Sequence, residues 1–63
     1  MKLTTINGKT IYGSRFYSLE LAESCVSRMI KPGRIILGDF SEYWVVLPVD
    51  AERLVRAGYE YAI

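Results

Sequence analysis

The sequence predicts a small α+β domain, a two-layer sandwich in which two helices cover one face of an antiparallel sheet. Three observations predict this fold class: an Asn-Gly dipeptide between two short strand-like runs, two helix-like stretches, and β-branched and aromatic runs between those stretches. If the first hairpin counts as one strand, the order is β-α-β-β-α-β, which is the ferredoxin-like arrangement. In the alternative, the hairpin contributes separate strands and the sheet has five strands with the same two helices.

The chain begins with a predicted β-hairpin. Asn7-Gly8 separates the runs Leu3–Ile6 and Lys9–Tyr12, and both turn residues tolerate the positive φ that a two-residue type I′ turn needs. Such a turn pairs Leu3 with Tyr12 at the open end of the hairpin. Each face then carries two large apolar side chains, so the pattern does not single out a solvent-facing side.

The first helix is predicted from Leu19 to about Ile30. Ser18 is a suitable N-cap, because its hydroxyl can accept a hydrogen bond from a free N–H of the first turn. Apolar residues recur at helical spacing along this stretch, and Pro32 ends it because proline cannot continue the backbone ladder. Cys25 lies at the margin of the apolar stripe, which favours a core thiol over a nucleophile.

A second hairpin and a second helix follow. The runs Arg34–Leu37 and Glu42–Leu47 are rich in β-branched and aromatic residues, and turn formers join them. Asp50 is the predicted N-cap of the second helix, and Gly58 is its left-handed C-terminal residue. The alternating residues 59–63 are then predicted to form an end strand.

Size and composition limit how this domain can be stabilised. The 63 residues form one domain, 1–63, and a chain this short draws only a few kcal/mol from a single core. Cys25 is the only cysteine and there is no histidine, so an intrachain disulfide and the usual zinc sites are excluded. Self-association therefore becomes an attractive source of stability.

The strand around Trp44 has apolar side chains on both faces. Tyr43, Val45 and Leu47 point one way, Trp44 and Val46 point the other way, and none is charged. Two helices on one side cover one face of a sheet, and an open apolar face is larger than the patch that a typical monomer exposes. The sequence therefore predicts that the open face is covered by a partner.

The leading hypothesis is a small non-enzymatic interaction or regulatory accessory protein, self-associating through the open sheet face or binding another protein. Two alternatives stay open for the apolar strands: the chain's own loops fold over the second face, or the face forms a ligand cleft. The predicted contact residues are Ile36, Trp44, Val46 and Tyr61, with Arg34 at the rim.

A second hypothesis is weak binding of single-stranded nucleic acid. Arg28, Lys31 and Arg34 cluster where the first helix ends, and aromatic side chains on a sheet can stack with bases. The net charge of +1 gives no strong field toward nucleic acid or anionic lipid.

No catalytic centre, cofactor site or metal site is predicted. The nearest approach to one is the carboxylate pair Asp39 and Glu42, and such a pair beside a turn is usually a solvated hairpin end. The N-terminus lacks the apolar region of a secretory signal, and no apolar run approaches the roughly 20 residues of a membrane span, so a cytoplasmic location is expected.

Overall fold

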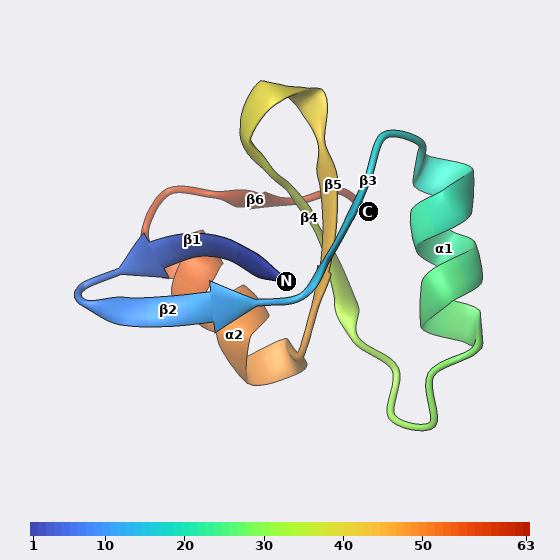
Figure 1. Ribbon diagram of the computed structural model, residues 1–63, viewed down its shortest axis with the longest axis horizontal. Helices are drawn as coiled ribbons and strands as arrows, with labels where there is room; N and C mark the ends of the chain where they lie inside the picture. The colour runs from blue at the N-terminus through green and yellow to red at the C-terminus, as the bar shows by residue number, and fades with distance from the viewer.

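The computed structural model describes all 63 residues and contains two antiparallel sheets and two helices (Figure 1), which confirms the α+β class. The smaller sheet is a hairpin of two strands, and the larger sheet has the strand order β3-β5-β4-β6. In chain order the elements are β1 (Lys2–Ile6), β2 (Lys9–Tyr12), β3 (Ser14–Phe16), α1 (Leu19–Ser27), β4 (Arg34–Leu37), β5 (Tyr43–Val46), α2 (Pro48–Arg56) and β6 (Glu60–Tyr61).

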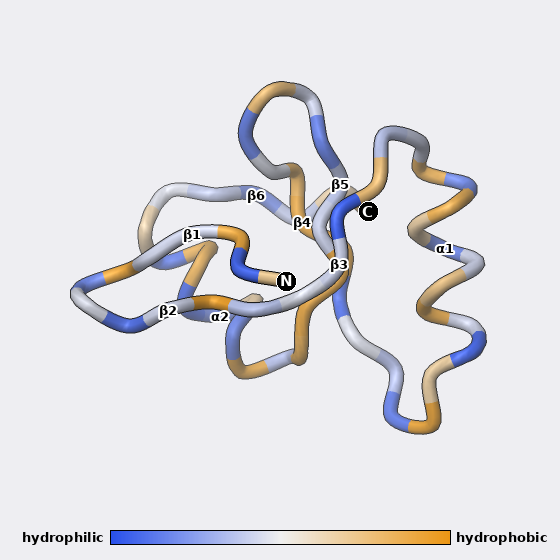
Figure 2. Tube along the Cα trace, in the orientation of Figure 1, coloured by the Kyte–Doolittle hydropathy of each residue, from blue (hydrophilic) through white to orange (hydrophobic).

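The two helices lie on opposite faces of the four-stranded sheet, so the prediction that both cover one face is wrong. On β4, Ile35 packs in one hydrophobic cluster with Ala22 of α1, whereas the next residue, Ile36, packs in another cluster with Leu54 of α2. Successive strand residues point to opposite faces, so the two clusters lie on the two sides of the sheet. Figure 1 shows α1 and α2 on either side of the sheet, and Figure 2 shows hydrophobic residues of β4 and β5 between them.

The position of β6 accounts for this arrangement. In a ferredoxin-like sheet the last strand lies beside the first, whereas here β6 pairs with β4 through Ile36 and Tyr61. The crossovers β3-α1-β4 and β5-α2-β6 therefore run in the same direction across the sheet, but they start from antiparallel strands. Two crossovers of the same hand must then place their helices on opposite faces. The strand order is thus not the ferredoxin-like one.

The β1-β2 hairpin forms its own sheet and covers the same face as α2. Its register matches the Asn7-Gly8 turn, except that an irregularity between Lys2 and Thr4 pairs Tyr12 with Lys2 in place of Leu3. One extra residue in a strand reverses the direction of the next side chain. Leu3 therefore joins Ile11 in the core instead of lying on the opposite face.

Helix α1 begins as predicted and ends early. The hydroxyl of Ser18 accepts a hydrogen bond from the Leu21 N–H at 3.4 Å, which confirms the N-cap. The helix ends at Ser27, and the Arg28 N–H closes its last turn on the Cys25 carbonyl at 3.1 Å. Because the helix stops before residue 30, Ile30 lies fully in solvent and does not extend the apolar stripe.

Helix α2 begins earlier than predicted and ends as predicted. Pro48 occupies its first turn after the N-cap Leu47, so Asp50 is not the N-cap. Proline suits this position because its missing N–H needs no partner there. At the other end Gly58 has φ +109°, and the Tyr59 N–H bonds to the Leu54 carbonyl at 3.0 Å. Neither helix has the length and hydrophobicity of a membrane span.

Candidate functional site

The predicted contact surface on the sheet is covered by the chain itself. Ile36, Trp44 and Val46 belong to the cluster formed with α2 and the β1-β2 hairpin, and Trp44 is only 1% exposed. Their apolar side chains therefore fill the core of one molecule and do not form an open face. The other two predicted contact residues remain accessible: Arg34 is exposed at the start of β4, and Tyr61 is 43% exposed on the edge strand β6.

Two of the aromatic side chains expected to stack with bases are turned into the core. Trp44 is buried and Tyr59 is half-buried against it, with ring centroids 5.3 Å apart and planes inclined by 38°. Arg28, Lys31 and Arg34 are all exposed around the segment that joins α1 to β4. Tyr61 is the aromatic side chain that lies open beside them, because it lines one surface hollow together with Arg34.

The acidic pair at the second hairpin is held by two different sets of partners. Glu42 is only 7% exposed, and its Oε1 accepts a hydrogen bond from the Trp44 indole Nε1 at 3.0 Å. The Nε of Arg15 lies 3.1 Å from the same oxygen in an ion pair, although its N–H is not directed at the carboxylate. Asp39 instead accepts from the Tyr59 hydroxyl at 3.2 Å. These contacts fix Trp44 and the turn in place.

Tyr59 provides a pH-dependent prediction. Burial raises the pKa of the Tyr59 hydroxyl above its ordinary value, the hydrogen bond to Asp39 and the charge of Asp39 raise it further, and a Thr4 contact opposes them. Because the folded state holds this proton more tightly than the unfolded chain, this contribution to stability is complete below about pH 10 and is lost as pH rises through the higher folded pKa. In urea unfolding at pH 8–11, we expect Tyr59→Phe to lose less stability above pH 10 than the parent protein. An identical pH dependence for both proteins would contradict this prediction, and Tyr17→Phe is the matched control.

The turn between β4 and β5 holds an aromatic residue in an unfavourable backbone conformation. Phe40 has φ +56° and ψ +39°, Ser41 has φ +61°, and the Glu42 N–H bonds to the Asp39 carbonyl at 3.2 Å. These values fit the two central positions of a type I′ turn, which normally take Asn, Asp or Gly. Phe40 is nevertheless 93% exposed, so no packing within the chain compensates for the strain.

This strain predicts a stabilising substitution. Because Asn adopts the left-handed conformation more readily than Phe, Phe40→Asn is expected to raise the free energy of unfolding by about 1 kcal/mol. Urea denaturation followed by Trp44 fluorescence measures the change. Tyr17→Asn, at another strongly exposed aromatic position with ordinary φ, is expected to give no such gain. A destabilised Phe40→Asn protein would mean that the Phe40 ring has a packing role within the chain.

A cavity of about 370 Å³ lies directly beside this turn. Two segments line it, Leu37–Asp39 from the second hairpin and Ala57–Glu60 after α2. Figure 1 shows the turn at the free end of the β4-β5 hairpin, projecting beyond the neighbouring strands. The exposed Phe40 therefore directly follows in the chain a residue, Asp39, that lines this concave surface.

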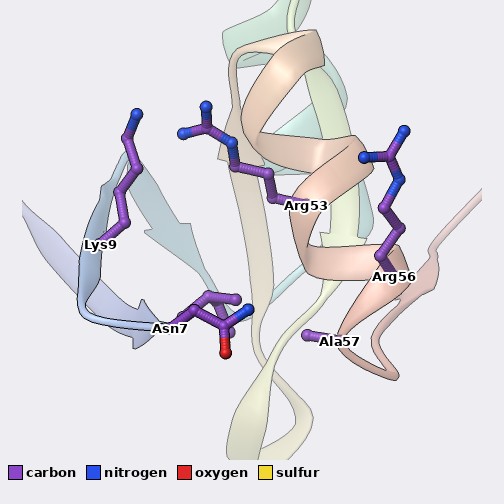
Figure 3. Close-up of a pocket in the computed structure, with 6 residues that line it drawn as sticks. Asn7, Lys9, Arg53, Arg56 and Ala57 are labelled. Atoms are coloured by element: carbon purple, nitrogen blue, oxygen red, sulfur yellow. The ribbon is translucent and has the colours of Figure 1, made fainter.

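A second cavity, of about 330 Å³, lies between the first hairpin and the end of α2 (Figure 3). Asn7 and Lys9 border it from the hairpin, and Arg53, Arg56 and Ala57 border it from the helix end, with Ile6 as a further apolar wall. We call this space the basic cavity. Lys9 lies more than 40 residues from Arg53 and Arg56 in the chain, so no local motif in the sequence indicated this cavity.

The sequence analysis predicted neither the exposed Phe40 with its neighbouring cavity nor the basic cavity. The sequence predicts that Phe40 lies in the turn. It does not predict the positive φ or the exposed ring, because no local pattern indicates either of them. Comparison with family models, with curated proteins and with solved structures found no match to this chain.

Proposed function

We propose that the protein is a small, non-enzymatic, cytoplasmic interaction module that self-associates through the β4–β5 turn. The observation that carries the proposal is Phe40, a large aromatic side chain that is 93% exposed at a positive φ. Strained residues that the fold does not need are concentrated at binding surfaces and functional sites. The turn thus takes the role that the sequence had assigned to the sheet face.

The occupant we propose is a second copy of the chain. The cavity lined by Leu37–Asp39 and Ala57–Glu60 includes Asp39, the residue before Phe40, so this part of the surface contains both an exposed ring and a hollow. A two-fold axis beside the turn places each Phe40 in the cavity of the other copy, because isologous contacts are reciprocal. Tyr59 at the cavity wall offers an aromatic surface for the incoming ring.

The proposed contact is weak. Burying one phenylalanine side chain contributes about 1.5–3 kcal/mol, and the two-fold axis doubles this gain before the entropy of association is subtracted. A dissociation constant on the order of 10⁻⁴ to 10⁻³ M then requires the remaining contacts between the turn and the cavity wall to offset most of the entropy of association, since 1 mM corresponds to about −4 kcal/mol. Association must accordingly be measured at millimolar protein concentration.

Sedimentation equilibrium and NMR diffusion of parent and variant chains test the proposal. Phe40→Asn is expected to weaken association by at least about tenfold, because two buried rings are lost from each dimer. The same substitution is expected to stabilise the fold, so lost association cannot be attributed to unfolding. Tyr17→Asn serves as the matched control and should associate like the parent.

Two outcomes oppose the proposal. The parent chain could stay monomeric at about 2 mM, which is twice the weakest dissociation constant expected. That result would show that the turn does not mediate self-association. A Phe40→Asn variant that associates as tightly as the parent would show the same. If Tyr61→Ala or Arg34→Ala weakens association while Phe40→Asn does not, the β4-β6 edge is the interface instead.

A further inference from the structure

The basic cavity concentrates positive charge on a nearly neutral molecule. The net charge is +1, yet three of the eight Lys and Arg residues border this one cavity. Lys9 comes from β2, and Arg53 and Arg56 come from α2, so two separate elements supply the charges. No carboxylate lines the cavity. Figure 3 shows Lys9 and Arg53 extending from the two facing sides of this space.

Interactions within the chain leave most of this charge uncompensated. Arg53 Nη1 lies 3.8 Å from Asp50 Oδ1, a long ion-pair contact, and neither Lys9 nor Arg56 is in an ion pair. The negative end of the α2 dipole favours arginines there, but it amounts to only about half a charge. The carbonyls of Arg53, Leu54 and Val55 moreover accept hydrogen bonds from the N–H groups that follow the helix. The helix end therefore does not neutralise three cations.

We infer that the basic cavity binds the phosphate group of a small organic phosphate monoester. Arginine side chains present paired N–H donors that match phosphate oxygens, and Lys9 adds a further charge. The Asn7 amide offers one more donor at the rim. Ile6 and Ala57 provide an apolar surface for the organic part, and about 330 Å³ lies at the small end of the range for ligand pockets. The basic cavity includes no residue of the β4–β5 turn and shares only Ala57 with the cavity proposed for self-association, so phosphate binding does not depend on that association.

NMR titration of the ¹⁵N-labelled protein with inorganic phosphate and with phenyl phosphate tests this inference. Saturable shifts are expected at the backbone amides of Asn7, Lys9 and Ala57 and at the Nε–H groups of Arg53 and Arg56. Phenyl phosphate is expected to bind several-fold more tightly than inorganic phosphate, because its ring can contact Ile6 and Ala57.

Charge-matched variants separate a specific site from general attraction. Arg53→Gln and Arg56→Gln are each expected to weaken phenyl phosphate binding by at least about fivefold, because each loses a charge-assisted pair of donors. Arg28→Gln removes the same charge at an exposed position that does not line the cavity, and it is expected to change affinity by less than about twofold. The amide spectra of the variants report whether each one is folded.

Three results overturn the inference. The first is shifts of equal size around Arg28, Lys31 and Arg34, and the second is an equal loss of affinity in Arg28→Gln. The third is an oligothymidylate without terminal phosphates that binds the same residues as tightly as phenyl phosphate, since the cavity then recognises a nucleic-acid backbone. Saturable binding confined to the basic cavity and lost in both arginine variants supports it.

Discussion

Trp44→Ala is expected to leave most of the chain unfolded at room temperature. Removing a buried aromatic side chain costs about 3–5 kcal/mol, which is as much as a single core supplies to a domain of this size. The same change takes the indole N–H away from Glu42, which is itself buried. Far-UV circular dichroism and the dispersion of the amide NMR spectrum measure the folded fraction.

Two companion variants separate loss of the fold from loss of an interface. Trp44→Phe keeps an aromatic ring and loses only the Glu42 hydrogen bond and part of the volume, so a smaller loss of stability is expected. Tyr61→Ala removes a partly exposed aromatic from the same sheet and is expected to stay folded. If the Trp44→Ala protein is fully folded and only fails to self-associate, Trp44 is an interface residue, as the sequence analysis predicted, and not a core residue.

Gly38→Ala is the second substitution with a large expected effect. Gly38 has φ −88°, a conformation that alanine adopts freely, so no backbone strain is involved. A Cβ at this position would instead collide with the Trp44 indole, which lies directly against the Gly38 Cα. Overpacking of this kind costs about 1–3 kcal/mol, and more where a ring cannot move. Here the ring is fixed by Glu42 on one side and Tyr59 on the other.

A double-mutant cycle identifies the cause of that loss. In a Trp44→Phe background the smaller ring no longer bonds to Glu42 and has room to shift away from the added methyl, so Gly38→Ala is expected to cost less than it does beside tryptophan. Urea denaturation of the four proteins gives the coupling energy. Additive losses would show that Gly38 is needed for another reason, such as the bulge in which both Gly38 and Asp39 pair with Glu42.

Local signals predicted most of the secondary structure. The Asn7-Gly8 turn, the Ser18 cap and the Gly58 helix end depend on the conformations of a few neighbouring residues, and all three are present. Pro48 is a local signal for the start of α2, and it prevails over the capping side chain of Asp50. The early end of α1 lacks such a signal, because apolar spacing continues to Ile30 while the helix does not.

The two candidate sites could not be predicted from the sequence, for two physical reasons. Phe40 is exposed and strained because the β4-β5 register puts it at a central position of a type I′ turn, and register is set by pairing across the sheet. The basic cavity exists because the first hairpin packs beside the end of α2, which brings Lys9 near Arg53 and Arg56. Neither relation is encoded in the spacing of residues along the chain.

By itself, the sequence determined the α+β class, the apolar character of both faces of β4 and β5, and the order of every strand and helix except β3. The strand β3 (Ser14–Phe16) was not predicted, because its three residues carry no strand pattern and are held by pairing with β5. Only the tertiary structure decided which edge of the sheet β6 would join. That choice follows from long-range pairing, and through the common hand of the two crossovers it places α2 and α1 on opposite faces. Both apolar faces are then covered within one molecule, so the surface left for a partner is the turn and not the sheet.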